Sequence, residues 1–138
     1  MTEKIYKILL NDKLFGTTKL EFGDPPMSVV FGQLNFAEKN IGYDFIKLYC
    51  TDNLIEIQTD YPKDKLISTG QIANLKVYNA ENLELVGIGN SIEGMDSDNY
   101  TITILGLDSE IYEKEFPEHI AEYEQKKSER TPLQKGKY

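Results

Sequence analysis

The chain has very little cysteine and lacks tryptophan. Its 138 residues include one cysteine and no tryptophan. A single cysteine, Cys50, excludes an internal disulfide bond and fits a reducing compartment. Because Cys50 has no second thiol and no cationic residue closer in sequence than Lys47, we predict a buried structural thiol and not a reactive one.

Long apolar runs are also missing. No stretch of about 18 apolar residues occurs, so the sequence predicts no membrane-spanning helix. The first residues, MTEKIYKILLND, include no apolar stretch of signal-peptide length. An apolar content of 40% and a charged content of 28% are ordinary for a folded domain of this size. We therefore expect a soluble cytoplasmic protein that does not act on membranes.

Motifs that would announce a reaction are absent or incomplete. Gly87 and Gly89 begin like a dinucleotide fingerprint, but Ile92 stands where the third glycine belongs. Small residues in a closely approached or bulged strand are the better interpretation. The sequence from Asp96 to Asp98 begins like a calcium loop, yet the required glycine and terminal glutamate are missing. An acidic hairpin turn explains this sequence better.

The one histidine, His119, is flanked by Glu118 and followed one helical turn later by Glu122. A histidine among carboxylates could serve as a general base. No nucleophile is fixed beside it by any motif, so we interpret His119 as a surface residue of a helix. The sequence also has no Walker loop and no zinc-ligand spacing. We expect no enzyme activity, no cofactor and no metal site.

Apolar alternation and turn residues predict an α+β domain built mostly of strands. We expect a mostly antiparallel sheet of about six strands, with one inserted helix and a C-terminal helix. Val86, Ile88 and Ile92 should lie on one face of a strand in a three-stranded meander. Residues 1–127 would form a single domain, and residues 128–138 a flexible C-terminal tail. The predicted elements are a hairpin of strands 4–10 and 14–22, a central strand 27–36, a helix 41–51, a strand 54–59, a meander from 71 to 104, a turn near 108–114 and a helix from Pro117 to about Lys127.

The distribution of acidic residues is uneven. The segment from Glu93 to Glu124, called the acidic segment below, contains ten acidic residues and one basic residue, Lys114. Isoleucine and aromatic residues are interleaved with these acids, as at Ile102 and Phe116, which is untypical of a disordered acidic tail. We therefore expect an ordered, strongly negative surface. Such a surface attracts cations or basic macromolecules, although solvated charge is the commoner role.

Tyrosines lie within the acidic segment and could anchor a protein partner. Aromatic side chains supply affinity at interfaces, while charge raises the rate of approach. A sequence pI near 4.7 argues against nucleic acid as the ligand, because that affinity requires lysine and arginine. The residues predicted to bind a partner protein are Glu93, Asp96, Asp98, Tyr100, Glu110, Tyr112 and Glu113.

Four blocks of sequence resemble a family of small bacterial proteins. They are residues 24–36 (DPPMSVVFGQLNF), 42–50 (GYDFIKLYC), 87–98 (GIGNSIEGMDSD) and 115–124 (EFPEHIAEYE). The family includes immunity proteins of polymorphic toxin systems, among them contact-dependent growth inhibition. The resemblance implies a cytoplasmic antitoxin that binds a cognate toxin domain, often a nuclease. It carries over no functional residue, because the family has no defining binding motif.

Two alternatives stay open at this point. Carboxylates around Asp96 and Asp98 could bind a divalent ion in a small metal-dependent hydrolase. The chain could instead be a homo-oligomeric adaptor, because exposed sheet edges make dimerisation easy.

Overall fold

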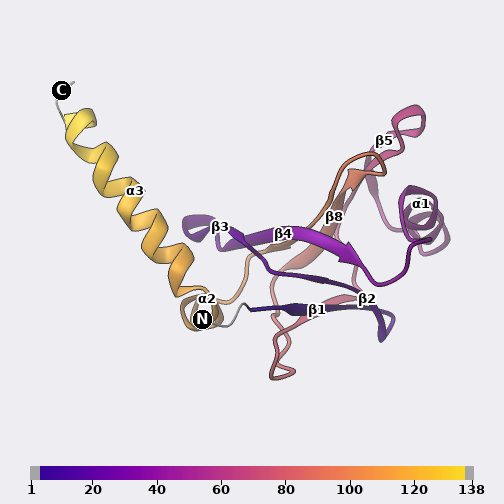
Figure 1. The fold of residues 1–138 in the computed structure, drawn as a ribbon, viewed down its shortest axis with the longest axis horizontal. Coiled ribbons are helices and arrows are strands. Elements are labelled where there is room, and N and C mark those ends of the chain that lie inside the picture. The colour runs from indigo at the N-terminus through magenta and orange to yellow at the C-terminus, as the bar shows by residue number, and fades with distance from the viewer. Residues whose placement is uncertain (1–3, 136–138) are drawn as a thin grey trace.

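The protein folds as one strongly bent antiparallel sheet with helices at its two ends (Figure 1). This computed structural model describes residues 4–135, with side chains described as far as Ser128. The predicted α+β class is confirmed, but the sheet has nine strands and not about six. The strands are β1 Tyr6–Leu10, β2 Lys13–Thr18, β3 Phe22–Asp24, β4 Val29–Phe36, β5 Ile57–Tyr61, β6 Leu66–Thr69, β7 Leu75–Tyr78, β8 Gly89–Met95 and β9 Tyr100–Leu105.

Three α-helices and two short 3₁₀ turns complete the described part of the chain. The α-helices are α1 Tyr43–Asp52, α2 Ser109–Glu115 and α3 Pro117–Lys135, and the 3₁₀ turns are η1 Pro25–Met27 and η2 Pro62–Asp64. Helix α1 corresponds to the predicted inserted helix. Helix α2 replaces the turn predicted near 108–114. Among the described residues, no helix is both long and apolar enough to cross a bilayer.

The strand order is β5-β6-β8-β9-β4-β2-β1-β7, with β3 paired to β4. The predicted strand 14–22 is divided into β2 and β3, because the chain turns at Leu20, which has a φ of 46°. The Thr18 hydroxyl accepts a hydrogen bond from the Leu20 amide and stabilises this turn. Strand β3 is too short to show alternation, which explains why sequence analysis did not separate it.

The predicted three-stranded meander is confirmed in its last pair, β8 with β9, but wrong in its first. Strand β7 pairs with β1, whereas β8 has β6 as its other neighbour. An isolated bridge from Tyr78 to Glu84 joins the end of β7 to the segment that precedes β8. Val86 and Ile88 are exposed and Ile92 is buried, so the three do not share a face.

The break in alternation occurs at closely packed glycines. A Cβ atom on Gly87 would lie 2.5 Å from the Leu105 carbonyl oxygen, so no side chain fits there. Leu85 faces the core before this point and Ile92 faces it afterwards, which shifts the inward positions from odd to even numbers. The predicted close approach at Gly87 is confirmed, but Gly87 lies outside any strand, two residues before β8 begins at Gly89.

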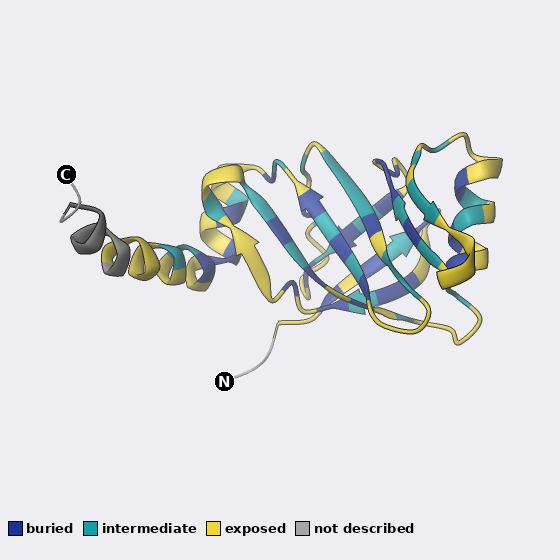
Figure 2. Ribbon diagram, turned by 90° about the horizontal axis from the view of Figure 1, so that it is seen from above, coloured by how far each residue is buried: buried dark blue, intermediate teal, exposed yellow. Residues whose placement is uncertain are grey.

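The core lies inside the bend of the sheet (Figure 2). Ile8, Val30 and Ile102, from β1, β4 and β9, have no exposed surface. Strand β4 is central as predicted, with β9 on one side and β2 and β3 on the other. Cys50 of α1 is buried, and burial raises the pKa of its thiol, as expected for a structural cysteine.

Helix α3 begins at Pro117, as predicted, and extends away from the sheet (Figure 1). It continues to Lys135, beyond the predicted end near Lys127. The predicted flexibility of residues 128–138 stays a prediction, and residues 136–138 lie outside the described part of the chain.

Candidate protein-interaction surface

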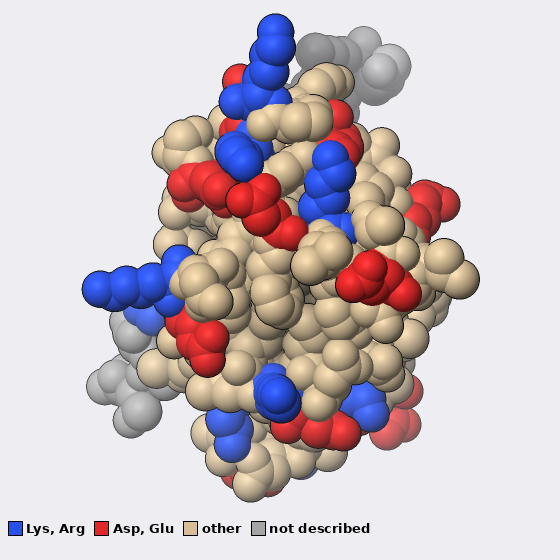
Figure 3. Space-filling view, turned by 90° about the vertical axis from the view of Figure 1, so that its right-hand side faces the viewer, with Lys and Arg blue, Asp and Glu red and all other residues tan. Residues whose placement is uncertain are grey.

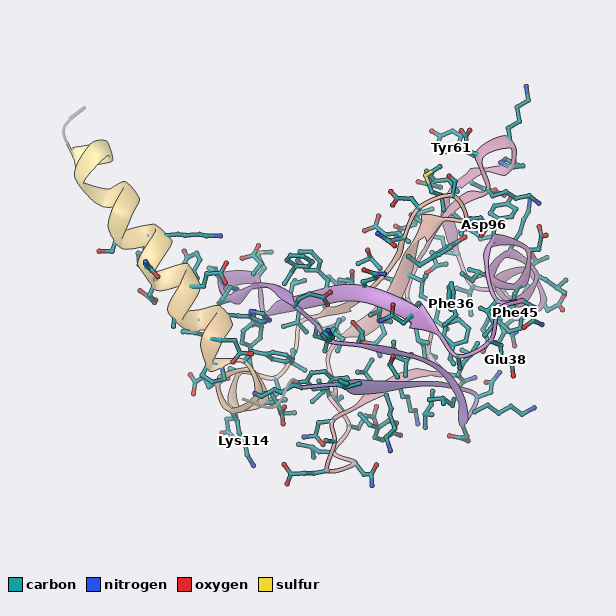
Figure 4. The ribbon with its side chains drawn as sticks, in the orientation of Figure 1. Phe36, Glu38, Phe45, Tyr61, Asp96 and Lys114 are labelled. Atoms are coloured by element: carbon teal, nitrogen blue, oxygen red, sulfur yellow. The ribbon has the colours of Figure 1, made fainter. Side chains whose placement is uncertain are left out.

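The acidic segment is ordered, but its residues are divided between the two ends of the molecule. Asp96 lies beside α1. Helix α2, which carries Glu110, Glu113 and Lys114, lies at the opposite end of the molecule (Figure 4). Strand β9 connects the two ends. The structure therefore does not bring the seven predicted residues together on one face, and their binding to a partner stays a prediction.

Asp96 and Tyr100 have a structural task at the first end. One carboxylate oxygen of Asp96 accepts hydrogen bonds from the Tyr43 amide at 2.9 Å and from the Tyr100 hydroxyl at 2.7 Å. Helix α1 is preceded by Gly42, which has no side chain for capping, so Asp96 provides the capping oxygen. Tyr100 is buried, and burial, followed by the bond to Asp96, raises the pKa of its hydroxyl. This pair fixes α1 to the β8–β9 turn.

The surface around α1 is of mixed charge (Figure 3). Lys47 forms an ion pair with Asp60 at 3.0 Å, and Lys65 forms one with Asp44 at 3.0 Å. The Tyr43 hydroxyl also donates to Asp60, and this bond, followed by Lys47, lowers the pKa of Asp60. Because Asp44 and Asp60 each pair with a lysine of the chain itself, part of the negative charge at this end is neutralised.

A hollow of about 380 Å³ lies beside the start of α1 and includes Asp96 and Asp98 in its wall. Among the described residues, no group of three or more histidine, cysteine, aspartate or glutamate side chains is arranged to hold a metal ion. The geometry at Asp96 and Asp98 therefore adds nothing in favour of the metal-dependent hydrolase.

At the opposite end, two members of the acidic segment belong to the interior. Tyr112 is buried, and its hydroxyl donates a hydrogen bond to the Val29 carbonyl at 3.0 Å. The Glu115 carboxylate is also buried and accepts hydrogen bonds from the Tyr6 hydroxyl at 3.1 Å and from the Asn79 amide at 2.6 Å. These groups connect α2 to the sheet, and little of either side chain is exposed.

His119 is not the surface residue that the sequence suggested. Its ring is buried, lies 2.8 Å from the Leu20 carbonyl oxygen and stacks on Phe116. A Cβ atom on Gly23 would lie 2.6 Å from the Tyr112 hydroxyl and 3.0 Å from the His119 ring, so the glycine permits close packing here. These contacts attach the first turn of α3 to β3. The apolar spacing of Phe116 and Ile120 is the one sequence signal that could have placed His119 inward.

Two grooves flank the base of α3, and Tyr123 lines both of them. The first, the β3–α3 groove, has a volume of about 200 Å³ and is lined by Glu21, Phe22, Gly23, Phe31, His119, Glu122, Tyr123 and Lys126. The second, the α2–α3 groove, has a volume of about 270 Å³ and is lined by Pro25, Pro26, Ser28, Ser109, Tyr112, Glu113, Ile120, Tyr123 and Glu124. We call the two grooves together the α3-base surface.

The α3-base surface combines carboxylates with exposed apolar side chains. Its charged side chains are Glu21, Glu113, Glu122, Glu124 and Lys126. Phe22 is 55% exposed and stacks on Phe31 with ring centroids 5.4 Å apart, and Met27 of the adjoining η1 is 68% exposed. Exposed apolar groups rimmed by charge are typical of protein-interaction sites. Of the residues that line this surface, only Tyr112 and Glu113 are among those predicted from the sequence to bind a partner protein.

Comparison of the chain with protein-family models, with curated proteins and with solved structures found no match.

The role of Asp96 as a helix cap can be tested with a matched pair of variants. Asp96→Ala should lower the free energy of unfolding by about 1–3 kcal/mol, because two hydrogen bonds are lost at the start of α1. Asp98→Ala, at an exposed position in the same turn, should change it by less than about 0.5 kcal/mol. Urea unfolding measures both. Equal losses would show that Asp96 does not cap α1.

The buried hydroxyl of Tyr112 predicts a dependence of stability on alkaline pH. Burial raises the pKa of Tyr112 from its ordinary value of 10.0 to about 12. The pKa of Tyr112 is higher in the folded state than in the unfolded state. The stabilisation of the folded state by the protonated hydroxyl is therefore complete below pH 10 and is lost as the pH rises through about 12. Urea unfolding across this range should therefore show a smaller alkaline loss for Tyr112→Phe than for the wild type. Tyr61→Phe, at a 58% exposed position, is the control, and indistinguishable pH profiles for both variants would contradict the assignment.

Proposed function

We propose that the protein is a non-enzymatic immunity protein that binds a basic toxin domain and neutralises it through the α3-base surface. The observation that carries this proposal is the combination of exposed apolar side chains, Phe22 and Met27, with four groove carboxylates and one lysine. The sequence resemblance to immunity proteins supports the antitoxin role.

The charge of the α3-base surface favours a basic partner. Complementary charge speeds association and disfavours wrong partners, while buried aromatic groups supply most of the affinity. A nuclease is one such partner, because a protein that cleaves a polyanion presents basic groups around its substrate. Occupation of that basic site by the carboxylates of this surface would exclude the nucleic acid substrate.

The proposed surface differs from the one predicted from sequence. Glu113 lines the α2–α3 groove, and Glu110 is exposed on the same short helix. Asp96 and Asp98 lie at the other end of the molecule, beside the mixed charges around α1. The proposal therefore retains the α2 acids and replaces the β8–β9 turn with β3, η1 and the first turns of α3.

Protection of a growing cell tests this function. The toxin domain encoded by the neighbouring reading frame would be co-expressed with this protein in a bacterial host. We expect the wild type to relieve growth arrest, and Glu113→Lys with Glu124→Lys to weaken toxin binding by at least about tenfold, mainly through the association rate.

The control is a double reversal of equal charge at the other end, Glu38→Lys with Asp98→Lys, both at exposed positions. This variant should protect as the wild type does, and thermal unfolding verifies that both variants fold. Full protection by the groove variant, or equal loss in both variants, would refute the proposed surface. Growth arrest that the wild type does not relieve would refute the antitoxin role.

A further inference from the structure

We infer that the β3–α3 groove is a receptor for an arginine side chain of the partner. The inference rests on the proposed function, because it names the chemical group that the basic partner would insert. Its evidence is the pairing of an aromatic floor with the Glu122 carboxylate in one groove of about 200 Å³.

The floor of the groove presents a flat π surface. Phe22 and Phe31 are opposite each other on β3 and β4, which directs both rings to the outer face of the sheet. The rings are stacked, with an interplanar angle of 27°. Phe22 remains 55% exposed although it is large and apolar, so much of this side chain is open to contact with a planar cation.

The carboxylate paired with this floor is that of Glu122, which lies on the second turn of α3 and approaches the groove from the helix side. Glu21 also lines the groove, but its carboxylate lies over Gly32, on the face of β4 opposite Phe31. A guanidinium group carries donors along its edges and stacks through its face. It can therefore contact the Phe22 ring and donate to a carboxylate at the same time, which the compact ammonium of lysine does less well.

A cation of the chain itself already uses part of this site. The Lys126 ammonium lies 3.2 Å from the Glu122 carboxylate, four residues earlier on α3. Both side chains are 63% exposed, so this ion pair is weak and open to exchange. An arriving arginine would replace Lys126 at Glu122 and would also stack on the Phe22 ring.

The experiment uses two short peptides as probes, one in which arginine alternates with glycine and one with lysine in place of arginine. Amide chemical shifts of the full-length protein are followed by NMR during each titration. We expect the arginine peptide to bind at least about fivefold more tightly, with shifts at residues 21–23 and 119–126. Phe22→Leu keeps an apolar side chain but removes the π face, so it should abolish the arginine preference.

Lys126→Gln removes the competing cation and should strengthen binding of the arginine peptide, while Lys63→Gln, on η2, is the control for lost positive charge. The amide spectrum of each free variant shows whether it is folded. Equal affinity for both peptides, shifts confined to the α1 end, or an arginine preference that persists in Phe22→Leu would overturn the inference. Such a result leaves toxin neutralisation through Glu113 and Glu124 standing. Loss of neutralisation with the arginine preference intact would instead refute the proposed function alone.

Discussion

The whole structure depends on enclosing one apolar sheet face. The strands of this chain bury their side chains mainly on one side, so the sheet bends until that side faces itself, and helices cover the ends of the resulting core. Burial of apolar surface of this kind is the dominant favourable term in folding. Each end is fixed by an acidic side chain: Asp96 accepts from the Tyr43 backbone amide at α1, and Glu115 of α2 accepts from the side chains of Tyr6 and Asn79.

This use of acids inside the fold changes the meaning of the acidic segment. Ten acidic residues close together in the sequence suggest a single negative surface. In the structure, β9 carries the chain from one end of the sheet to the other within this segment, and a six-residue strand spans about 20 Å. The carboxylates are thereby distributed among two helix caps, Asp96 at α1 and Asp108 at α2, a buried network at Glu115, and exposed positions at both ends. The negative surface that results is assembled at the base of α3 from Glu21, outside the segment, as well as from α2 and α3.

Much of the fold could be predicted because it follows from local patterns. Alternation identified β1, β2, β4 and β9, the spacing of Ile41, Phe45 and Tyr49 identified α1, and Pro117 marked the start of α3. Pairing could be predicted only between strands that follow each other in the chain, as for β1 with β2 and β8 with β9. The connection of β7 to β1 is set by long-range packing, and the change of alternation near Gly87 depends on a close contact with Leu105. The candidate surface was missed for a related reason, since β3 is three residues long and Phe22 meets Phe31 only after β3 folds back onto β4.

Hydrogen exchange of the protein, alone and bound to the proposed toxin domain from the neighbouring reading frame, tests most directly whether the α3-base surface is the interface. The account predicts new protection at residues 21–27 and 109–126, which form the α3-base surface, with little change around α1. Protection confined to residues 38–52 and 93–99 would contradict it and place the interface at the opposite end of the sheet.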